Sequence, residues 1–118
     1  MAAASPAPPA PPARGRSAAD VFHAIADPNR RRLLDLLSDG EKPVQDLAAG
    51  FDISFAAVSQ HLQILHATGL VTRRADGRRR LYSAKPQGLQ EVYEWTARYR
   101  AFWERRLDRL NDYLDRQR

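Results

Sequence analysis

The chain has 118 residues, and 19 Lys and Arg against 14 Asp and Glu give it a formal net charge of +5. This length is enough for one small domain. Because the chain has no cysteine, disulfides, thiolate metal sites, iron–sulfur clusters and cysteine nucleophiles are excluded. No apolar run is long enough to cross a membrane and the N-terminus has no secretory signal pattern, so we expect a cytoplasmic protein that does not bind membranes.

The first sixteen residues differ in composition from the rest of the chain. Six of them are Ala and five are Pro, and no large apolar side chain follows Met1. Such a segment cannot bury enough apolar surface to offset the entropy that it loses on ordering. We therefore expect residues 1–16 to form a disordered tail and residues 17–118 to form the folded domain.

The first part of this domain is predicted to hold three short helices. Apolar residues recur at helical spacing over 18–26, 28–38 and 43–49. Ser17 and Asp27 are residue types that accept hydrogen bonds from free backbone amides at helix starts, so they are the expected N-caps of the first two helices.

A fourth helix is predicted over 55–67, with Ser54 as its N-cap. Its apolar residues repeat every three or four positions and are expected to face the core. They are Phe55, Val58, Leu62 and Leu65. Two helices joined by a short turn, the second of them capped, are typical of a helix-turn-helix.

A β-hairpin is predicted directly after this helix. Residues 70–74 and 78–83 have the composition of strands, and Asp76-Gly77 between them is typical of a two-residue type I′ turn. Residues 73–80 carry five arginines and one aspartate. The predicted fold is therefore mainly α with a small β-hairpin wing, a winged helix-turn-helix with the element order α-α-α-α-β-β-α.

The last segment, 87–115, is predicted to be one continuous helix of roughly 40 Å. Apolar side chains recur along it at helical spacing, over a greater length than the small domain can cover. We therefore expect a homodimer that is formed through the first and last helices. The residues expected at this interface are Val21, Phe22, Ile25, Leu89, Val92, Tyr99, Trp103, Leu107, Leu110 and Leu114.

Three segments match, in order, the motifs of a known family. They are FHAIADPNRR at 22–31, VSQHLQIL at 58–65, and GLV at 69–71 followed by GRRRLY at 77–82. Their order and spacing resemble the ArsR (SmtB-like) family of bacterial winged helix-turn-helix repressors. The resemblance implies a homodimeric transcriptional repressor that binds a palindromic operator in double-stranded DNA, and it implies no enzymatic activity.

In that setting the helix over 55–67 is expected to enter the major groove. Gln60 is the best candidate for reading a base, because its amide can pair bidentately with adenine. His61 is expected to face DNA, with a structural hydrogen bond as the alternative, and a plain helix cap is the alternative for Ser54. The residues expected to bind DNA are Ser54, Ala57, Ser59, Gln60, His61, Gln63, Arg74, Arg78, Arg79 and Arg80.

The hairpin arginines are expected to contact phosphates or the minor groove, because they lie at a hairpin tip beside the predicted recognition helix. Arg78 and Arg79 are the preferred pair, with Arg80 or Arg74 in support. For the arginines at 30–32, a contact with the DNA backbone and a solvated helix start remain equal alternatives.

The metal sites of the resembled family have no counterpart in this chain. Pro43 and Gln45 stand in the places of the family's cysteine ligands, and the last helix contains no histidine. We therefore expect neither a metal nor a cofactor. A small apolar or aromatic effector, a protein effector and no effector all remain open. The aromatic cluster on this helix is expected to belong to the dimer core, and it consists of Trp95, Tyr99, Phe102 and Trp103.

One other class of function is considered for the same fold. A winged-helix dimerisation module would act through a protein partner and would not bind DNA. The expected mark of such a module is a neutral or acidic hairpin, whereas this hairpin is strongly basic.

Overall fold

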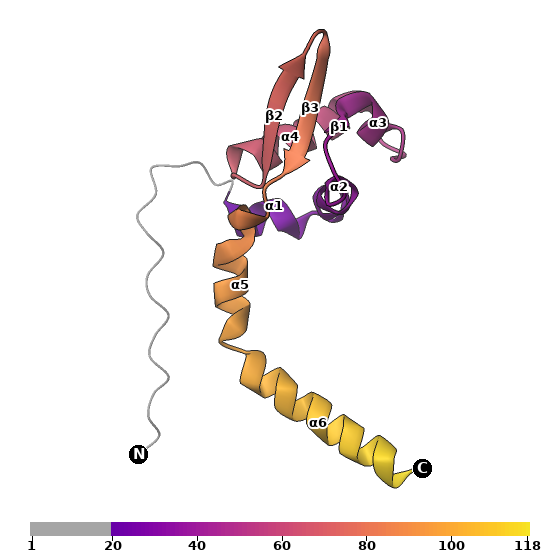
Figure 1. Cartoon of the computed structure of the whole chain (residues 1–118), viewed down its shortest axis with the longest axis vertical. Coiled ribbons are helices and arrows are strands. Elements are labelled where there is room, and N and C mark those ends of the chain that lie inside the picture. Colours follow the sequence, from indigo (N-terminus) through magenta and orange to yellow (C-terminus); the bar gives the residue numbers. More distant parts are fainter. Residues whose placement is uncertain (1–19) are drawn as a thin grey trace.

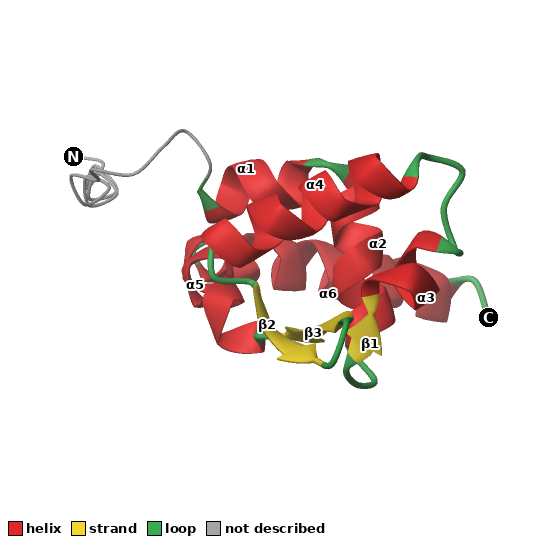
Figure 2. Ribbon diagram, turned by 90° about the horizontal axis from the view of Figure 1, so that it is seen from above, coloured by secondary structure: helices red, strands yellow, loops and turns green. Residues whose placement is uncertain are grey.

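The computed structural model describes residues 20–118 of the chain. The expected tail at 1–16 and the expected cap Ser17 lie outside the described residues. The first helix begins at Val21, later than expected, and its N-cap is Asp20, whose side chain accepts a hydrogen bond from the amide of His23 at 2.8 Å. The helices are α1 (Val21–Ala26), α2 (Pro28–Leu37), α3 (Val44–Ala48), α4 (Phe55–Ala67), η1 (Pro86–Leu89), α5 (Gln90–Ala97) and α6 (Arg100–Arg116). Helices α1 to α4 form a body with a small sheet along one side (Figure 2), and α5 and α6 run away from it (Figure 1).

The sheet is antiparallel and has the strand order β1-β3-β2. Its strands are β1 (Lys42–Pro43), β2 (Val71–Asp76) and β3 (Arg79–Ala84). β2, β3 and their turn are called the wing below. β1 was not predicted, since two residues show no alternation of apolar and polar side chains. Pro43 pairs with Leu81 in β1 and is also the N-cap of α3, so the third helix begins one residue later than expected.

The core is formed by the apolar sides of α1 to α4 and the base of the wing. Its buried residues are Val21, Ala24, Leu33, Leu37, Val44, Leu47, Val58, Leu62, Leu65, Leu70, Val71 and Tyr82. The predicted stripe of α4 is confirmed at three of its four positions. Phe55 is the exception, with 54% of its surface exposed. The side chains of a helix lean toward its N-terminus and pack over the preceding turn. Phe55 is the first residue of α4, so its ring has no preceding turn to pack over and stays exposed.

The end of α4 fixes where the wing starts. The amide of Leu70 donates to the carbonyl oxygen of Leu65 at 2.9 Å, and that of Gly69 donates to His66 at 3.1 Å. This pair of bonds is a Schellman motif, and it requires the φ of +80° that Gly69 adopts. The predicted helix end at Gly69 is confirmed, and Leu70 enters the core one residue later.

The turn of the wing lies one residue further along than expected. Asp76 pairs with Arg79, which leaves Gly77 and Arg78 as the two turn residues. Gly77 has a φ of +63°, and no residue other than glycine has a positive φ in the described part of the chain. A positive φ at the first central position alone is typical of a type II′ turn, so the type I′ turn predicted at Asp76-Gly77 is wrong.

The last segment is not the single helix that its composition predicted. It consists of η1, α5 and α6, with a break at Arg98 and Tyr99. The amide of Tyr99 donates to Thr96 three residues earlier, and the Thr96 hydroxyl donates to the carbonyl of Tyr93. Hydrogen bonds of this kind tighten and bend a helix without any Gly or Pro, so composition could not reveal the break.

Gly88 in η1 packs directly on the end of α4. A Cβ atom at Gly88 would overlap the carbonyl oxygen of Gly69 and lie 3.0 Å from Cδ2 of Leu70. We expect Gly88→Ala to lower the free energy of unfolding by about 1–3 kcal/mol, measured by urea unfolding. Gly50→Ala is the matched control, because its new methyl would lie no closer than 3.6 Å to its nearest neighbour. Equal losses in both variants would contradict this view of Gly88.

Candidate nucleic-acid interface

The corner between α1 and α2 is organised by Asp27. One carboxylate oxygen of Asp27 accepts hydrogen bonds from the amides of Asn29 at 2.7 Å and Arg30 at 3.3 Å. Partial burial opposes ionisation of Asp27, but these amide hydrogen bonds and the nearby basic groups together outweigh it and lower the pKa of the carboxyl. The predicted cap at Asp27, with Pro28 as the first helical residue, is confirmed.

Arg30 and Arg31 close the other side of this corner. Arg30 donates from Nη2 to the carbonyl oxygen of His23 at 3.0 Å and from Nε to that of Ala24 at 2.6 Å. Arg31 donates from Nη1 to the carbonyl oxygens of Ile25 at 2.7 Å and Ala26 at 3.1 Å. These four carbonyls end α1 and lack partners inside the helix. Arg30 is only 6% exposed, so it is neither the phosphate contact nor the solvated residue that we considered.

Arg30 also reaches α4, the helix that is expected to read DNA. Its Nη1 lies 3.2 Å from Nδ1 of His61. Because a guanidinium only donates, Nδ1 accepts, and the ring proton of His61 is left on Nε2. His61 is half-buried in this contact, which is the structural hydrogen bond weighed as its alternative role. Its expected contact with DNA stays a prediction, and it would involve Nε2.

The exposed side of α4 carries most of the residues expected to read DNA. Ser54 caps the helix by accepting a hydrogen bond from the amide of Ala57 at 3.0 Å, as predicted. Gln60 and Gln63 are exposed, whereas Ala57 and Ser59 are half-buried. The amide groups of both glutamines are therefore available to a ligand that approaches this side of the body.

A shallow hollow of about 220 Å³ joins α4 to the wing, and we call it the wing hollow. It is lined by Val44, Gln45, Phe55, Ser59, Arg78 and Arg80. The structure thus brings Ser59 together with two of the predicted wing arginines. Phe55 was missed as a site residue, because its place in the apolar repeat indicated the core.

Arg74 and Arg79 lie on the other face of the wing from Arg80. In the strand register Arg80 stands opposite Ala75, and alternate residues of a strand point to opposite faces. Arg79 forms an ion pair with Asp76 at 3.7 Å. The ten expected DNA contacts are therefore not all on one surface.

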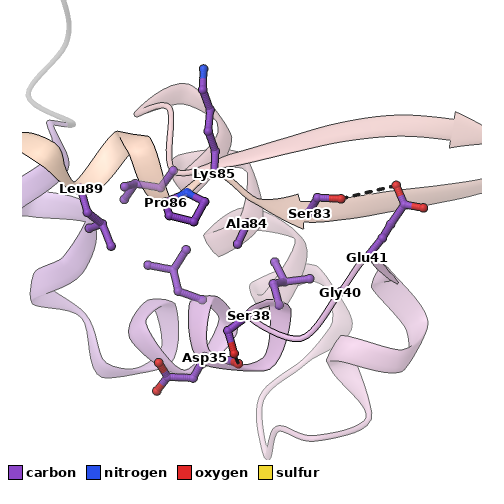
Figure 3. A pocket seen from close by; sticks show the side chains of 12 residues that line it. Asp35, Ser38, Gly40, Glu41, Ser83, Ala84, Lys85, Pro86 and Leu89 are labelled. Carbon is purple, nitrogen blue, oxygen red and sulfur yellow. Dashed lines mark hydrogen bonds between the residues drawn. The ribbon is translucent and has the colours of Figure 1, made fainter.

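Arg74 is engaged by Glu41 in a two-pronged contact. Nε and Nη2 of Arg74 donate to the two carboxylate oxygens at 2.8 and 2.7 Å, and this contact lowers the pKa of Glu41. The Ser83 hydroxyl lies 3.5 Å from the same carboxylate (Figure 3). Glu41 and Ser83 stand at one edge of an apolar hollow of about 490 Å³ between α2, β3 and η1. The contact between Arg74 and Glu41 thus attaches β2 to the segment that precedes β1.

The residues expected at a dimer interface fall into two groups. Val21 is only 4% exposed and belongs to the core of its own chain, against expectation, and Phe22, Ile25, Leu89 and Val92 are half-buried against that core. The remaining expected residues are exposed on α6 and at the break that precedes it. The exposed large apolar side chains of this region are Tyr93, Trp95, Tyr99, Phe102, Trp103, Leu107, Leu110, Tyr113 and Leu114. We call this set the C-terminal apolar face.

Two further properties of residues 20–118 bear on function. None of the helices in this range combines the length and the apolar character that crossing a bilayer requires. Within the same range, no three His, Asp or Glu side chains come together in the way a metal site would need.

Replacing Arg30 tests the corner directly. We expect Arg30→Lys to lower the free energy of unfolding by about 2–4 kcal/mol, because the single nitrogen of a lysine cannot reach all three acceptors that now contact three separate guanidinium nitrogens. Arg32→Lys is the control: it makes the same change at an exposed position of α2, where we expect a loss within about 0.5 kcal/mol. Denaturant unfolding measures both, and a small loss for Arg30→Lys would contradict its structural role.

Comparison with known proteins agrees with this arrangement. Residues 27–73 match the family model described as "Bacterial regulatory protein, arsR family". The transcriptional repressor SdpR of Bacillus subtilis is 38% identical over 76 residues, which are 64% of this chain and 84% of that protein. The HTH-type transcriptional regulator Rv2034 of Mycobacterium tuberculosis is 36% identical over 100 residues, 85% of this chain and 91% of that protein.

Solved structures show the same likeness. The crystal structure of the ArsR family transcriptional regulator RHA00566 aligns with a TM-score of 0.63 at 32% identity, over 70% of this chain and 86% of that one. The crystal structure of a possible transcriptional regulator for arsenical resistance aligns with a TM-score of 0.59 at 49% identity, over 74% of this chain and 88% of that one. The fold is therefore the expected winged helix-turn-helix. The chain belongs to the arsR family of bacterial regulatory proteins, which are DNA-binding regulators of transcription and not enzymes.

Proposed function

We propose that this protein is a homodimeric repressor that binds a palindromic operator. Each protomer would place α4 in the major groove and its wing along the adjacent backbone. The observation that carries the proposal is the wing hollow, where Ser59 of α4 lies with Arg78 and Arg80 of the wing. Side chains suited to base edges and side chains suited to phosphates thus share one surface.

Within this surface, Gln60 and Gln63 are the candidates for base readout. Both are exposed on α4, and a Gln amide can donate to N7 and accept from N6 of adenine. Ser59 and Ser54 have hydroxyl groups that suit phosphates or either type of base. The Ser54 hydroxyl keeps its proton available, because its oxygen accepts from Ala57.

The wing arginines divide by partner. Arg78 and Arg80 line the wing hollow and face the same ligand as Ser59. Arg74 and Arg79 are each held by a carboxylate, so a phosphate would have to compete with Glu41 or Asp76. We therefore assign the main phosphate contacts to Arg78 and Arg80, and lesser ones to Arg79 and Arg74.

The dimer is proposed from the C-terminal apolar face. Nine large apolar side chains exposed within 93–114 leave far more apolar surface in water than a small monomer usually does. Trp95 connects this face to the body, since its ring packs edge-on against Phe22 at a centroid distance of 5.8 Å. In a dimer with its two-fold axis beside α6, the C-terminal apolar faces of the two protomers would be buried against each other. The same symmetry would place one copy of α4 at each of the two half-sites of the operator.

The repressor is proposed to act without the thiolate metal site of its family. Pro43, at one cysteine place, is paired with Leu81 in the sheet, and Gln45, at the other, lines the wing hollow. Neither side chain can bind a soft metal ion as a thiolate does.

Selection of binding sites from a randomised duplex library tests the central proposal. We expect a palindrome with half-sites about one helical turn apart. Gln60→Ala should then weaken binding to the selected site more than to random DNA. Arg80→Ala should weaken both about equally and reduce the salt slope by about 1. Equal losses of Gln60→Ala on both DNAs would remove its base-reading role.

The oligomeric state is tested by sedimentation of the full chain. We expect a dimer, and we expect Leu107→Glu to raise its dissociation constant about 100-fold, because the new carboxylate would be desolvated in an apolar interface. Arg105→Glu is the control, since two residues along a helix place the same new side chain on nearly the opposite side of α6. A monomeric wild type would contradict the proposal.

A further inference from the structure

Phe55 exposes an aromatic ring that the proposed dimer does not explain. Among the described residues, every other exposed large apolar side chain belongs to the C-terminal apolar face. Phe55 lies instead at the first position of α4, outside the segment 93–114 that carries this face. With 54% of its surface exposed, it is not a core residue either. The proposed dimer therefore leaves the ring of Phe55 uncovered.

The surroundings of Phe55 are those of the proposed DNA surface. It is the first residue of α4, directly after the cap Ser54. It shares the wing hollow with Ser59, one turn further along, and with Arg78 and Arg80. Residues at the N-terminus of a recognition helix are the ones that meet base edges in the major groove.

We propose that Phe55 contacts the 5-methyl group of a thymine in each half-site of the operator. The inference rests on the proposed function and deepens it by naming a base. A phenyl ring offers no hydrogen bond to a base edge, and the thymine methyl is the apolar group that the major groove displays. The exposed methyl of Ala56 lies next in sequence and adds to the apolar spot. Contact would remove both the ring and the base methyl from water.

Other uses of the ring fit the geometry less well. Stacking of an aromatic ring on a base requires an unstacked strand, whereas a recognition helix meets intact duplex. A phosphate contact requires a donor, which Phe55 lacks. A protein partner at this position would have to cover the guanidinium groups of Arg78 and Arg80, which are charged and exposed.

The test uses the full chain and the duplex selected from the randomised library. Each thymine of a half-site is replaced in turn by deoxyuridine, which removes the methyl group and keeps the base pairing. We expect one symmetry-related thymine pair at which the wild type loses about fourfold in affinity per half-site, the effect of burying one methyl group. Replacements outside the half-sites should have no effect.

Variants assign this effect to the ring. Phe55→Ala should bind thymine and deoxyuridine duplexes equally at that position, and Phe55→Leu should keep part of the difference. Gln60→Ala is the matched control, because it should bind more weakly and still show the fourfold difference. Urea unfolding checks that Phe55→Ala is folded, which its exposed position favours.

The outcomes separate this inference from the proposed function. A wild type that selects no sequence would contradict both. Selected half-sites without thymine, a wild type insensitive to every deoxyuridine, or a methyl effect that persists in Phe55→Ala would each overturn the role of Phe55. In those three cases the proposed repressor would stand.

Discussion

The buried guanidinium of Arg30 joins three helices that have different tasks. Arg30 belongs to the first turn of α2, donates hydrogen bonds to carbonyl oxygens at the end of α1, and contacts His61 on α4. Burying a charged group is costly unless its donors are satisfied, and here carbonyl oxygens and an imidazole nitrogen accept from them. The position of α4 relative to α1 therefore depends on one side chain. Because α5 packs on α1 through Phe22 and Trp95, the same contact relates the proposed DNA surface to the C-terminal apolar face.

The wing is held to this body at its base and along one edge. The Schellman motif at Gly69 sets the point at which the chain leaves α4, and Gly88 packs against the same turn. The contact between Glu41 and Arg74 attaches the wing to the segment before β1. The arginines of the wing also differ in their partners. Arg74 and Arg79 are paired with carboxylates on one face, whereas Arg78 and Arg80 line the wing hollow and remain available to a polyanion.

The C-terminal apolar face follows from the break between α5 and α6. Edge-to-face contacts link Phe22 to Trp95 and Trp95 to Tyr99, so aromatic rings continue from the body to the start of α6. Beyond that point α6 projects from the body, and its apolar residues remain exposed in the single chain (Figure 1). A second copy of the chain is the simplest partner that supplies an equally long apolar face.

Short-range signals in the sequence determined the helix-turn-helix, the hairpin and the basic charge of that hairpin. The caps at Asp27 and Ser54 and the helix end at Gly69 each depend on hydrogen bonds within a few residues, so local patterns revealed them. Only the tertiary structure decided which of three consecutive arginines is buried, because burial of Arg30 depends on how α1 and α4 pack around it. Packing likewise decided the exposure of Phe55, whose apolar character is the same in a core and on a DNA surface.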